Sequence, residues 1–315
     1  MHIRRVIEIK ELERILMRSK STFSIKSKPK CFVPKSEPPD EVNIYRLQHF
    51  IDKSKHLFVI TGAGLSTESG IPDYRSEGVG LYATSSNRPV QYKDFLKSAD
   101  IRRRYWARNF VGWPRFSSFL PNVSHQIFRQ WEVKNKINWL VTQNVDALHC
   151  KAGSTKVTEL HGSSHRVECL TCKQIIPRNR MQEMIISLNP DWHEQSFDIA
   201  PDGDVNLKWE QVEGFKVPPC DNCGGILKPN IIFFGDNVPR EVVSSVFDQL
   251  DKCDAVLVAG SSLQVFSGFR FVSKAHDDGK PISIVNIGST RADHLASIKI
   301  SAQCGKVLSQ IDVDL

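Results

Sequence analysis

Two pairs of closely spaced cysteines are the clearest chemical feature of the sequence. Cys169 and Cys172 form one C-x-x-C pair, and Cys220 and Cys223 form the second. Each pair turns two thiolates toward one point, and two pairs supply the four sulfur ligands of a tetrahedral zinc ion. Since protein sulfurs then fill every coordination position, the predicted zinc holds structure and leaves no position for water or substrate. The catalytic groups must lie elsewhere in the chain.

Two other uses of paired cysteines fit the sequence less well. Disulfide bonds are not favoured, because Cys31, Cys150, Cys253 and Cys304 are scattered without matching spacing. A thioredoxin-like redox pair is not favoured either, because there are two pairs and neither lies between a strand and a helix. Structural zinc is the interpretation that we expect to hold.

His161 is the candidate general base. A single histidine is most often a packed, hydrogen-bonded side chain, and that interpretation suits most of the ten histidines. His161 differs because it directly precedes the zinc module, where a cleft between two parts of the fold is expected. Imidazole is the side chain best suited to accept a proton near neutral pH.

Four apolar runs of strand length must position these residues. They lie at 56–60, 138–142, 255–259 and 281–286. Nearly continuous apolar strands, separated by amphipathic helical stretches, indicate a parallel sheet covered on both faces. We therefore predict an α/β fold, in which a Rossmann-like parallel sheet domain carries an inserted small zinc-ribbon and helical domain.

Each apolar run ends in a cluster of glycine or polar residues. Ligands of such sheets bind beyond the carboxyl ends of the strands, so the four clusters indicate one crevice. In chain order the clusters are Gly62, Ala63 and Gly64; Gln143, Asn144, Val145 and Asp146; Gly260, Ser261 and Ser262; and Asn286, Ile287 and Gly288.

The glycine turn at residues 62–64 is a weak signal by itself. It is not the G-x-G-x-x-G of a common dehydrogenase, because the next glycine, Gly70, comes too late. Its place after a strand favours phosphate binding, since the N–H groups at a helix start suit a pyrophosphate. Asp73, Tyr74 and Arg75 follow in a proline-containing loop that we expect to cover a bound ligand.

The net charge of +7 belongs to the N-terminal segment. Residues 1–35 hold ten Lys and Arg against three acidic residues, and the rest of the chain holds 32 of each sign. We therefore expect no nucleic-acid partner. No apolar run approaches the roughly 18 residues of a membrane span, so we expect no membrane partner. The composition of residues 1–35 favours a mitochondrial transit peptide, with a surface helix on a disordered arm as the alternative.

The remaining chain is predicted to form two domains. The Rossmann-like domain takes residues 43–165 and 225–315, and it includes a cofactor loop and helical insertion within 75–135. The zinc-binding domain takes residues 166–224 and includes a long loop at 189–215. Aromatic residues in this loop argue against disorder.

In their order along the chain, these motifs resemble the signature of the sirtuin family, and in particular its class II members. The resemblance covers about residues 45–310. It includes the four clusters, His161 with Gly162, both cysteine pairs and the Ile-Phe-Phe-Gly-Asp segment at 232–236. Two positions depart from the commoner pattern, because Asp236 replaces a usual Glu and Tyr74 a usual Phe. Both changes can alter rate or peptide choice.

The resemblance implies NAD⁺-dependent removal of acyl groups from protein lysines, with release of nicotinamide and transfer of the acyl group to ADP-ribose. It implies NAD and one structural zinc ion as cofactors. His161 is then the base, with Asn144 and Asp146 as further catalytic residues. The implied cofactor-binding residues are Gly62, Ala63, Gly64, Ser66, Asp73, Tyr74, Arg75, Gln143, Asn144, Val145, Asp146, Gly260, Ser261, Ser262, Asn286, Ile287, Gly288 and Cys304.

The resemblance also implies where the acylated peptide binds. An apolar lysine tunnel and an edge for an added peptide strand are expected along residues 232–235, that is Ile232, Phe233, Phe234 and Gly235. One of the two phenylalanines is expected to be a core residue instead.

Tyr105 and Arg108 are candidate acyl-binding residues. At spacing i and i+3 they share one face if the segment is helical. A desuccinylating member of the family reads an acyl carboxylate with the same Tyr-x-x-Arg spacing. A salt-bridged surface arginine is the alternative.

We expect longer or unusual acyl groups, such as lipoyl, biotinyl or acidic-branched acyls, to be preferred over acetyl. The reason is that the loop at 189–215 is predicted to fold toward the acyl channel and restrict it. Its acidic residues Asp202, Asp204 and Glu210 are expected to meet basic groups near the channel mouth, including Arg108, and a surface segment or a docking site for a partner is the alternative. The expected partners are acylated mitochondrial proteins, among them metabolic enzymes, in the matrix, and the protein is expected to be a monomer. A protein mono-ADP-ribosyltransferase and an NAD-sensing regulator with little turnover are the alternatives.

Overall fold

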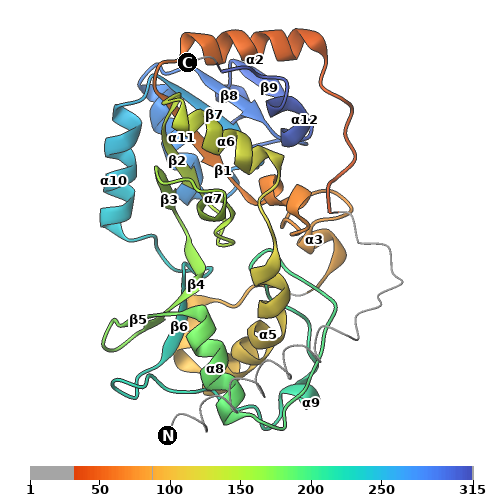
Figure 1. The fold of residues 1–315 in the computed structure, drawn as a ribbon, viewed down its shortest axis with the longest axis vertical. Helices are drawn as coiled ribbons and strands as arrows, with labels where there is room; N and C mark the ends of the chain where they lie inside the picture. Colours follow the sequence, from red (N-terminus) through yellow and green to blue (C-terminus); the bar gives the residue numbers. More distant parts are fainter. Residues whose placement is uncertain (1–31, 87, 314–315) are drawn as a thin grey trace, which may run out of the picture. The chain divides into compact units, whose positions relative to one another are not determined.

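Among residues 32–86 and 88–313, which the computed structural model describes, six parallel strands form a large sheet (Figure 1). The strand order is β3-β2-β1-β7-β8-β9. Numbered within this sheet alone, the order is 3-2-1-4-5-6, which is that of a Rossmann fold. The strands are β1 (Leu57–Thr61), β2 (Ile137–Thr142), β3 (Val157–Glu159), β7 (Ala255–Ala259), β8 (Ile282–Val285) and β9 (Ile298–Ile300).

The sheet confirms the predicted parallel architecture and adds two strands. Every neighbouring pair in it runs parallel. The four apolar runs became β1, β2, β7 and β8, whereas β3 and β9 were not predicted. Both are edge strands of three residues. Such short segments lack the continuous apolar run by which a central strand is found.

Helices cover both faces of the large sheet, as its apolar strands require. Leu57 and Val59 of β1 pack into a core with α2 (Glu41–Lys53), α6 (Val123–Val133) and α12 (Cys304–Leu308). Phe58 and Ile60 point to the opposite face and pack against α10 (Arg240–Asp251) and α11 (Phe266–Asp277). Since successive side chains of a strand alternate between faces, a strand buried on both sides is apolar throughout.

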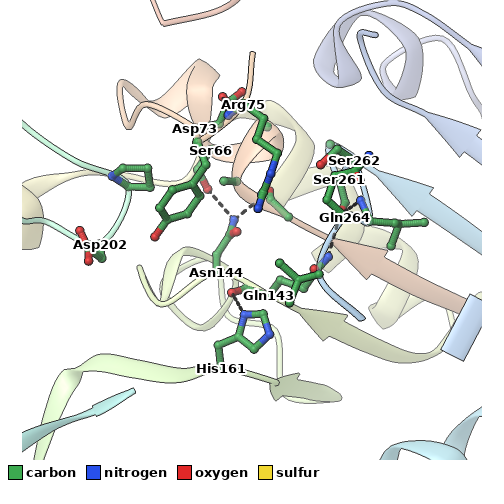
Figure 2. Close-up of a pocket in the computed structure, with 18 of the residues that line it drawn as sticks. Ser66, Asp73, Arg75, Gln143, Asn144, His161, Asp202, Ser261, Ser262 and Gln264 are labelled. Carbon is green, nitrogen blue, oxygen red and sulfur yellow. Dashed lines mark hydrogen bonds between the residues drawn. The ribbon is translucent and has the colours of Figure 1, made fainter. Parts of the chain in front are cut away.

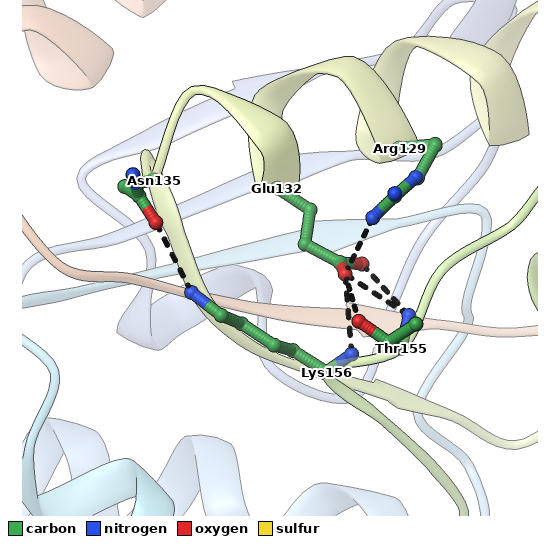
Figure 3. Close-up of polar contacts among 5 residues, drawn as sticks. All are labelled: Arg129, Glu132, Asn135, Thr155 and Lys156. Atoms are coloured by element: carbon green, nitrogen blue, oxygen red, sulfur yellow. Dashed lines mark hydrogen bonds and ion pairs between the residues drawn. The ribbon is translucent and has the colours of Figure 1, made fainter.

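A buried carboxylate holds one edge of this sheet to α6 (Figure 3). Glu132 accepts hydrogen bonds from the Thr155 hydroxyl at 2.7 Å, the Thr155 N–H at 3.0 Å and Arg129 at 2.8 Å. Burial acts to raise the pKa of Glu132, but these donors hold it below its ordinary value. The contact fixes the start of β3, and the chain passes from β3 almost directly to His161.

A smaller antiparallel sheet, in the order β5-β4-β6, forms the second part of the fold. It consists of β4 (Gly162–Cys169), β5 (Ile175–Pro177) and β6 (Leu227–Ile231). Helix α8 (Arg178–Leu188) packs against β4 and β5. Its core also includes Tyr105, Trp106 and Ala107 of α5 (Ala99–Ser118). The helical insertion therefore shares a core with the zinc module. The module also includes β6, which lies beyond the predicted range of 166–224.

The other short elements connect these parts. None of the helices in the described residues is long and apolar enough to cross a bilayer. The predicted transit peptide, residues 1–35, falls outside the described residues except at its last four positions. The connecting elements are the 3-10 helices η1 (Ala63–Ser69) and η2 (Asp293–Leu295), and the helices α3 (Leu81–Thr84), α4 (Tyr92–Lys97), α7 (Leu148–Lys151) and α9 (Trp209–Val212).

The long loop at 189–215 is ordered by packing more than by regular structure. Trp192 and Phe215 stack edge to face with ring centroids 4.8 Å apart, and Phe110 of α5 lies 5.8 Å from Trp192. Close approach to α5 depends on two glycines. A Cβ at Gly112 would lie 2.0 Å from the Gly203 carbonyl oxygen, and one at Gly203 would lie 2.7 Å from the Phe116 ring. The backbone of the loop can approach α5 this closely only because neither Gly112 nor Gly203 has a side chain.

Candidate active site

The four paired cysteines gather at one point, as predicted. Their sulfur atoms all lie within 4.8 Å of one another, with Cys169 and Cys223 at 3.5 Å and Cys172 and Cys220 at 3.8 Å. Zinc–sulfur bonds of about 2.3 Å in a tetrahedron place sulfurs about 3.8 Å apart, so the donor set fits one zinc ion. Gly225 completes the cradle, because a Cβ there would lie 2.9 Å from the Cys169 sulfur.

The cysteine cluster is separate from the chemistry. Cys169 ends β4, whereas Gly162, next to His161, begins it. Seven residue steps along a strand span about 23 Å. None of the four cysteines lines the cavity described next. A zinc ion here is therefore suited to hold the small module together.

A cavity of about 1420 Å³ opens at the carboxyl ends of β1, β2, β7 and β8 (Figure 2). It includes the point between β1 and β7 at which the strand order reverses, which is where open α/β sheets bind ligands. Pockets for one small ligand commonly measure about 300–1,000 Å³, so this cavity has room for two bound groups.

Nearly all the sequence-predicted site residues line this cavity. Of the 25 predicted residues outside the zinc cluster, two do not line it, Arg108 and Cys304. Those that do are Gly62, Ala63, Gly64, Ser66, Asp73, Tyr74, Arg75, Tyr105, Gln143, Asn144, Val145, Asp146, His161, Ile232, Phe233, Phe234, Gly235, Gly260, Ser261, Ser262, Asn286, Ile287 and Gly288.

Backbone from two neighbouring strand ends forms the glycine cradle of the cavity. A Cβ at Gly62 would lie 2.8 Å from the Ser261 Cβ, and one at Gly64 would lie 2.9 Å from the Gly260 carbonyl oxygen. Gly260 itself has φ +63°, and a Cβ on it would lie 2.3 Å from the Leu65 nitrogen. The two turns pack backbone against backbone, and the start of η1 lines the cavity beside them. The N–H groups at a helix start suit a pyrophosphate.

The segment after β2 is tied to this cradle by hydrogen bonds (Figure 2). Asn144 Nδ2 donates to the Gly62 carbonyl and to the Ser66 hydroxyl, each at 3.0 Å. The Ser66 hydroxyl donates to Asp146 at 2.7 Å. Gln143 Nε2 donates to the Ser261 hydroxyl at 2.7 Å. Burial raises the pKa of Asp146 above its ordinary value, although the bonds from Leu148 and Ser66 oppose that rise.

His161 lies between the two sheets and reaches the cavity from below Asn144 in Figure 2. Its Nδ1 lies 2.9 Å from the Gln143 carbonyl oxygen, and its Nε2 lies 2.7 Å from the Ser267 hydroxyl. Burial lowers the pKa of His161 below its ordinary value, and the bond to Gln143 only partly offsets this. The imidazole is therefore neutral near pH 7, as a general base must be.

Asp73 stabilises the loop that follows η1, in which it lies next to Tyr74 and Arg75. Asp73 is buried and accepts hydrogen bonds from the Arg75 N–H at 3.0 Å and the Ser76 N–H at 2.7 Å. Arg75 lies over the Tyr82 ring at 5.5 Å, and Tyr74 lies 6.0 Å from the Phe234 ring. Asp73 thus shapes the loop, while Tyr74 and Arg75 face the cavity.

The segment after β6 supplies the opposite wall. Phe233 is a core residue that also reaches the cavity, and it packs against Phe95 at 5.1 Å and Tyr105 at 5.2 Å. Phe234 is only half-buried. This difference agrees with the expectation that one of the two phenylalanines belongs to the core. The Ile232 N–H donates to the His161 carbonyl at 2.8 Å, which joins the wall to the candidate base.

Arg108 is not brought to the cavity, unlike Tyr105 on the same helix. Its Nε donates to Asp204 at 2.9 Å, and its second nitrogen also bonds this carboxylate. The pair is largely buried, so Arg108 is not a surface salt bridge either. Asp204 of the loop at 189–215 thus pairs with Arg108, which is therefore not available to bind an acyl carboxylate.

Cys304 also falls outside the cavity. It is buried in α12, and its thiol lies 3.5 Å from the Val285 carbonyl oxygen. Burial raises the pKa of this thiol to about 12. Cys304 supports the end of β8 and does not face a ligand.

Some lining residues escaped the sequence prediction. Pro201, Ser267 and Arg270 line the cavity. Asp202 lines it as well, in agreement with the expectation that the long loop places acidic residues near the channel mouth. Only the fold brings α11 to His161, because 106 positions separate Ser267 from it. The one available signal was a hydroxyl residue just beyond the Gly-Ser-Ser cluster at the start of a helix.

Comparison with known proteins agrees with this geometry. Residues 62–267 match the model of the Sir2 family. The chain is 55% identical over 281 residues to the NAD-dependent protein lipoamidase sirtuin-4, mitochondrial, of Bos taurus, with 89% of each protein covered. It is also 55% identical to the protein of the same name in Homo sapiens, covering 89% of this chain and 90% of that protein. Its identity to the NAD-dependent protein deacylase Sirt4 of Drosophila melanogaster is 52%, with 89% and 90% covered.

A solved structure gives the same assignment. The chain superposes on the structure described as a Sir2-p53 peptide-NAD⁺ complex with a TM-score of 0.67 at 27% identity, covering 85% of this chain and 96% of that one. The resemblance that the motifs carried is therefore confirmed, and the chain belongs to the Sir2 family.

Proposed function

We propose that the protein is an NAD-dependent protein-lysine deacylase that prefers lipoyl and similar long, uncharged acyl groups. The observation that carries this proposal is the meeting of a glycine cradle and a neutral histidine in one cavity. The printed names of the relatives, lipoamidase and deacylase, support both the chemistry and the acyl group.

The residues present fit NAD. Gly62, Gly64 and Gly260 let two turns pack closely beside the start of η1, which suits a pyrophosphate, and Ser66, Gln143 and Asn144 offer polar atoms for a ribose and an amide. Asn286 at the end of β8 lies where the adenosine half of a Rossmann ligand extends. When bound, NAD supplies a good leaving group, nicotinamide, on the ribose carbon that accepts the acyl oxygen.

The chain's own residues provide orientation and proton transfer. Asn144 and Asp146 are fixed by Ser66 and the cradle, so both groups are placed before any ligand arrives. His161 is held neutral and accepts a proton from a substrate hydroxyl at Nε2. Phe233, Phe234 and Tyr105 line an apolar channel that excludes water from the acyl-lysine.

Two acidic residues of the long loop set the charge of the acyl channel. Asp202 lines the cavity, and burial followed by repulsion from Asp204 raises its pKa to about 6. Near pH 8 it is therefore ionised and repels an acyl carboxylate. Because Arg108 is paired with Asp204, no free cation from α5 offsets that repulsion. This arrangement favours uncharged acyl groups, and we rank acidic-branched acyls behind lipoyl and biotinyl.

The names of two relatives support the proposed location, and the proposed partners depend on that location. The bovine and human proteins are named mitochondrial, which supports a mitochondrial location, and within the mitochondrion we propose the matrix. Its substrates are then acylated mitochondrial proteins, among them metabolic enzymes, and it acts as a monomer.

Turnover on a peptide panel tests the proposed function. One peptide sequence would carry acetyl, lipoyl, biotinyl or an acidic-branched acyl group on its lysine. Mass spectrometry would then measure free lysine and acyl-ADP-ribose. We expect both products in equal amounts, and most from the lipoyl peptide. ADP-ribose attached to protein without deacylated peptide would instead indicate a mono-ADP-ribosyltransferase, and NAD binding without any product would indicate a sensor.

A further inference from the structure

Ser267 makes the second hydrogen bond of the candidate base. It lies in the first turn of α11 and lines the same cavity as His161. Its hydroxyl oxygen is 2.7 Å from His161 Nε2, whereas the Gln143 carbonyl oxygen is 2.9 Å from Nδ1. The imidazole ring is thus held from both sides, by the segment after β2 and by the helix after β7.

The partners fix the tautomer of the ring. A carbonyl oxygen only accepts, so Nδ1 must carry the proton that it shares with Gln143. In the neutral ring Nε2 is then the bare nitrogen, and it can only accept. The Ser267 hydroxyl is therefore the donor, and it points its proton at the lone pair that a general base uses.

We propose that Ser267 is a positioning residue for the general base, which holds the His161 ring in the Nδ1–H tautomer with Nε2 turned toward the cavity. This inference rests on the proposed function, since it deepens the role given there to His161. A hydroxyl suits the task because it can donate to the bare Nε2 without carrying a charge of its own.

The bond also keeps His161 neutral. A donor that binds the uncharged form of a group opposes its protonation, and the helix N-terminus next to it opposes a positive charge as well. The charged groups that line the cavity from the neighbouring elements are Asp146 after β2, Asp236 after β6 and Arg270 on α11. Burial also lowers the pKa of His161.

Nuclear magnetic resonance of the ligand-free protein tests the contact without any turnover. Ring ¹⁵N and ¹³C shifts of His161 would be followed against pH in the wild type, Ser267→Ala, Ser267→Thr and Ser273→Ala. Ser273 lies on the same helix but does not line the cavity, so its variant is the matched control. We expect the pKa of His161 to rise by about 0.5–1 unit in Ser267→Ala, because one hydrogen bond to the neutral ring is lost. The threonine variant keeps a hydroxyl and should resemble the wild type.

Kinetics of the same variants supply the second readout. We expect Ser267→Ala to lower kcat about tenfold with the KM for NAD unchanged, and to move the acid limb of the pH profile upward with the pKa of His161. Unchanged shifts and pKa of His161 in Ser267→Ala would overturn the proposal. Faster turnover by that variant would overturn it too, since the hydroxyl would then block the base.

These outcomes are separable from those of the proposed function. An absence of deacylation by the wild type on every peptide would contradict the proposed function, whereas the titration of His161 would still report on Ser267.

Discussion

Replacing Gly203 by alanine should loosen the acyl selectivity of the protein without unfolding it. Gly203 has φ +83° and lies against Phe116 of α5. The preceding residue, Asp202, lines the cavity. A Cβ at this position would lie 2.7 Å from the Phe116 ring, so ring and loop must move apart. Gly214, in the same loop, is the matched control, because it has φ +78° but no atom within 4 Å of an added Cβ.

The energies decide what moves. An alanine in the left-handed region costs about 1 kcal/mol in either variant. Overpacking against Phe116 adds about 1–3 kcal/mol in Gly203→Ala alone. Val205 and Leu207 are buried next to this site, and each stabilises the docked loop by about 1.5–3 kcal/mol. Burial of Val205 and Leu207 stabilises the docked loop by more than the contact with Phe116 destabilises it. We therefore expect the loop to stay docked on α5 while residues 200–204 shift within it.

The assay compares stability and acyl choice in the two variants. We expect Gly214→Ala to lower the melting temperature by about 2–4 °C and to keep the wild-type ratio of lipoyl to acetyl turnover. Gly203→Ala should lower the melting temperature further and bring that ratio at least about fivefold closer to one, which corresponds to about 1 kcal/mol. A Gly203→Ala protein of reduced stability but unchanged acyl ratio would refute selection by the loop, and would leave it a structural or docking segment.

Three further changes test other parts of the site. His161→Ala should lower kcat by about a hundredfold or more while NAD binding, measured by calorimetry, is kept. In the wild-type protein the acid limb of kcat/KM should lie below pH 6.5, because the lowered pKa keeps His161 neutral as the pH falls through 6.5. Cys169→Ser should lose zinc and aggregate, because metal binding is coupled to folding; a soluble, active, zinc-free variant in elemental analysis would contradict the zinc assignment. Asp204→Asn leaves the buried Arg108 without its counter-charge, so we expect a loss of about 3 kcal/mol in unfolding free energy and relatively faster turnover of acidic-branched acyl peptides.

The large sheet and the zinc cluster were predictable because local patterns encode them. Strands β1, β2, β7 and β8 are buried on both faces, so each reads as an apolar run and ends in the cluster that lines the cavity. Two C-x-x-C pairs with no other cysteine at matching spacing leave few geometries for four sulfurs. Here sequence distance matters little, since parallel strands bring their carboxyl ends to one edge.

Contacts between distant segments could not be predicted in this way. The Tyr-x-x-Arg spacing placed Tyr105 and Arg108 on one helical face, as α5 confirms, but it left open whether Arg108 binds an acyl carboxylate or pairs with an acid of the long loop. The structure shows that Arg108 pairs with Asp204, 96 positions away, as the prediction for the loop acids allowed. The glycine pair Gly112 and Gly203 likewise has meaning only once the loop lies on α5.

The same reasoning explains why the base was found and its partner was missed. His161 stands at a boundary that the sequence marks, between an apolar strand and a cysteine pair. Ser267 is an ordinary serine at a helix start, where the residue type is common for local reasons. Its side chain, however, bonds His161 and not its own helix backbone. A hydroxyl near a helix N-terminus that makes a distant bond is therefore the feature to seek when a predicted general base has one unassigned ring nitrogen.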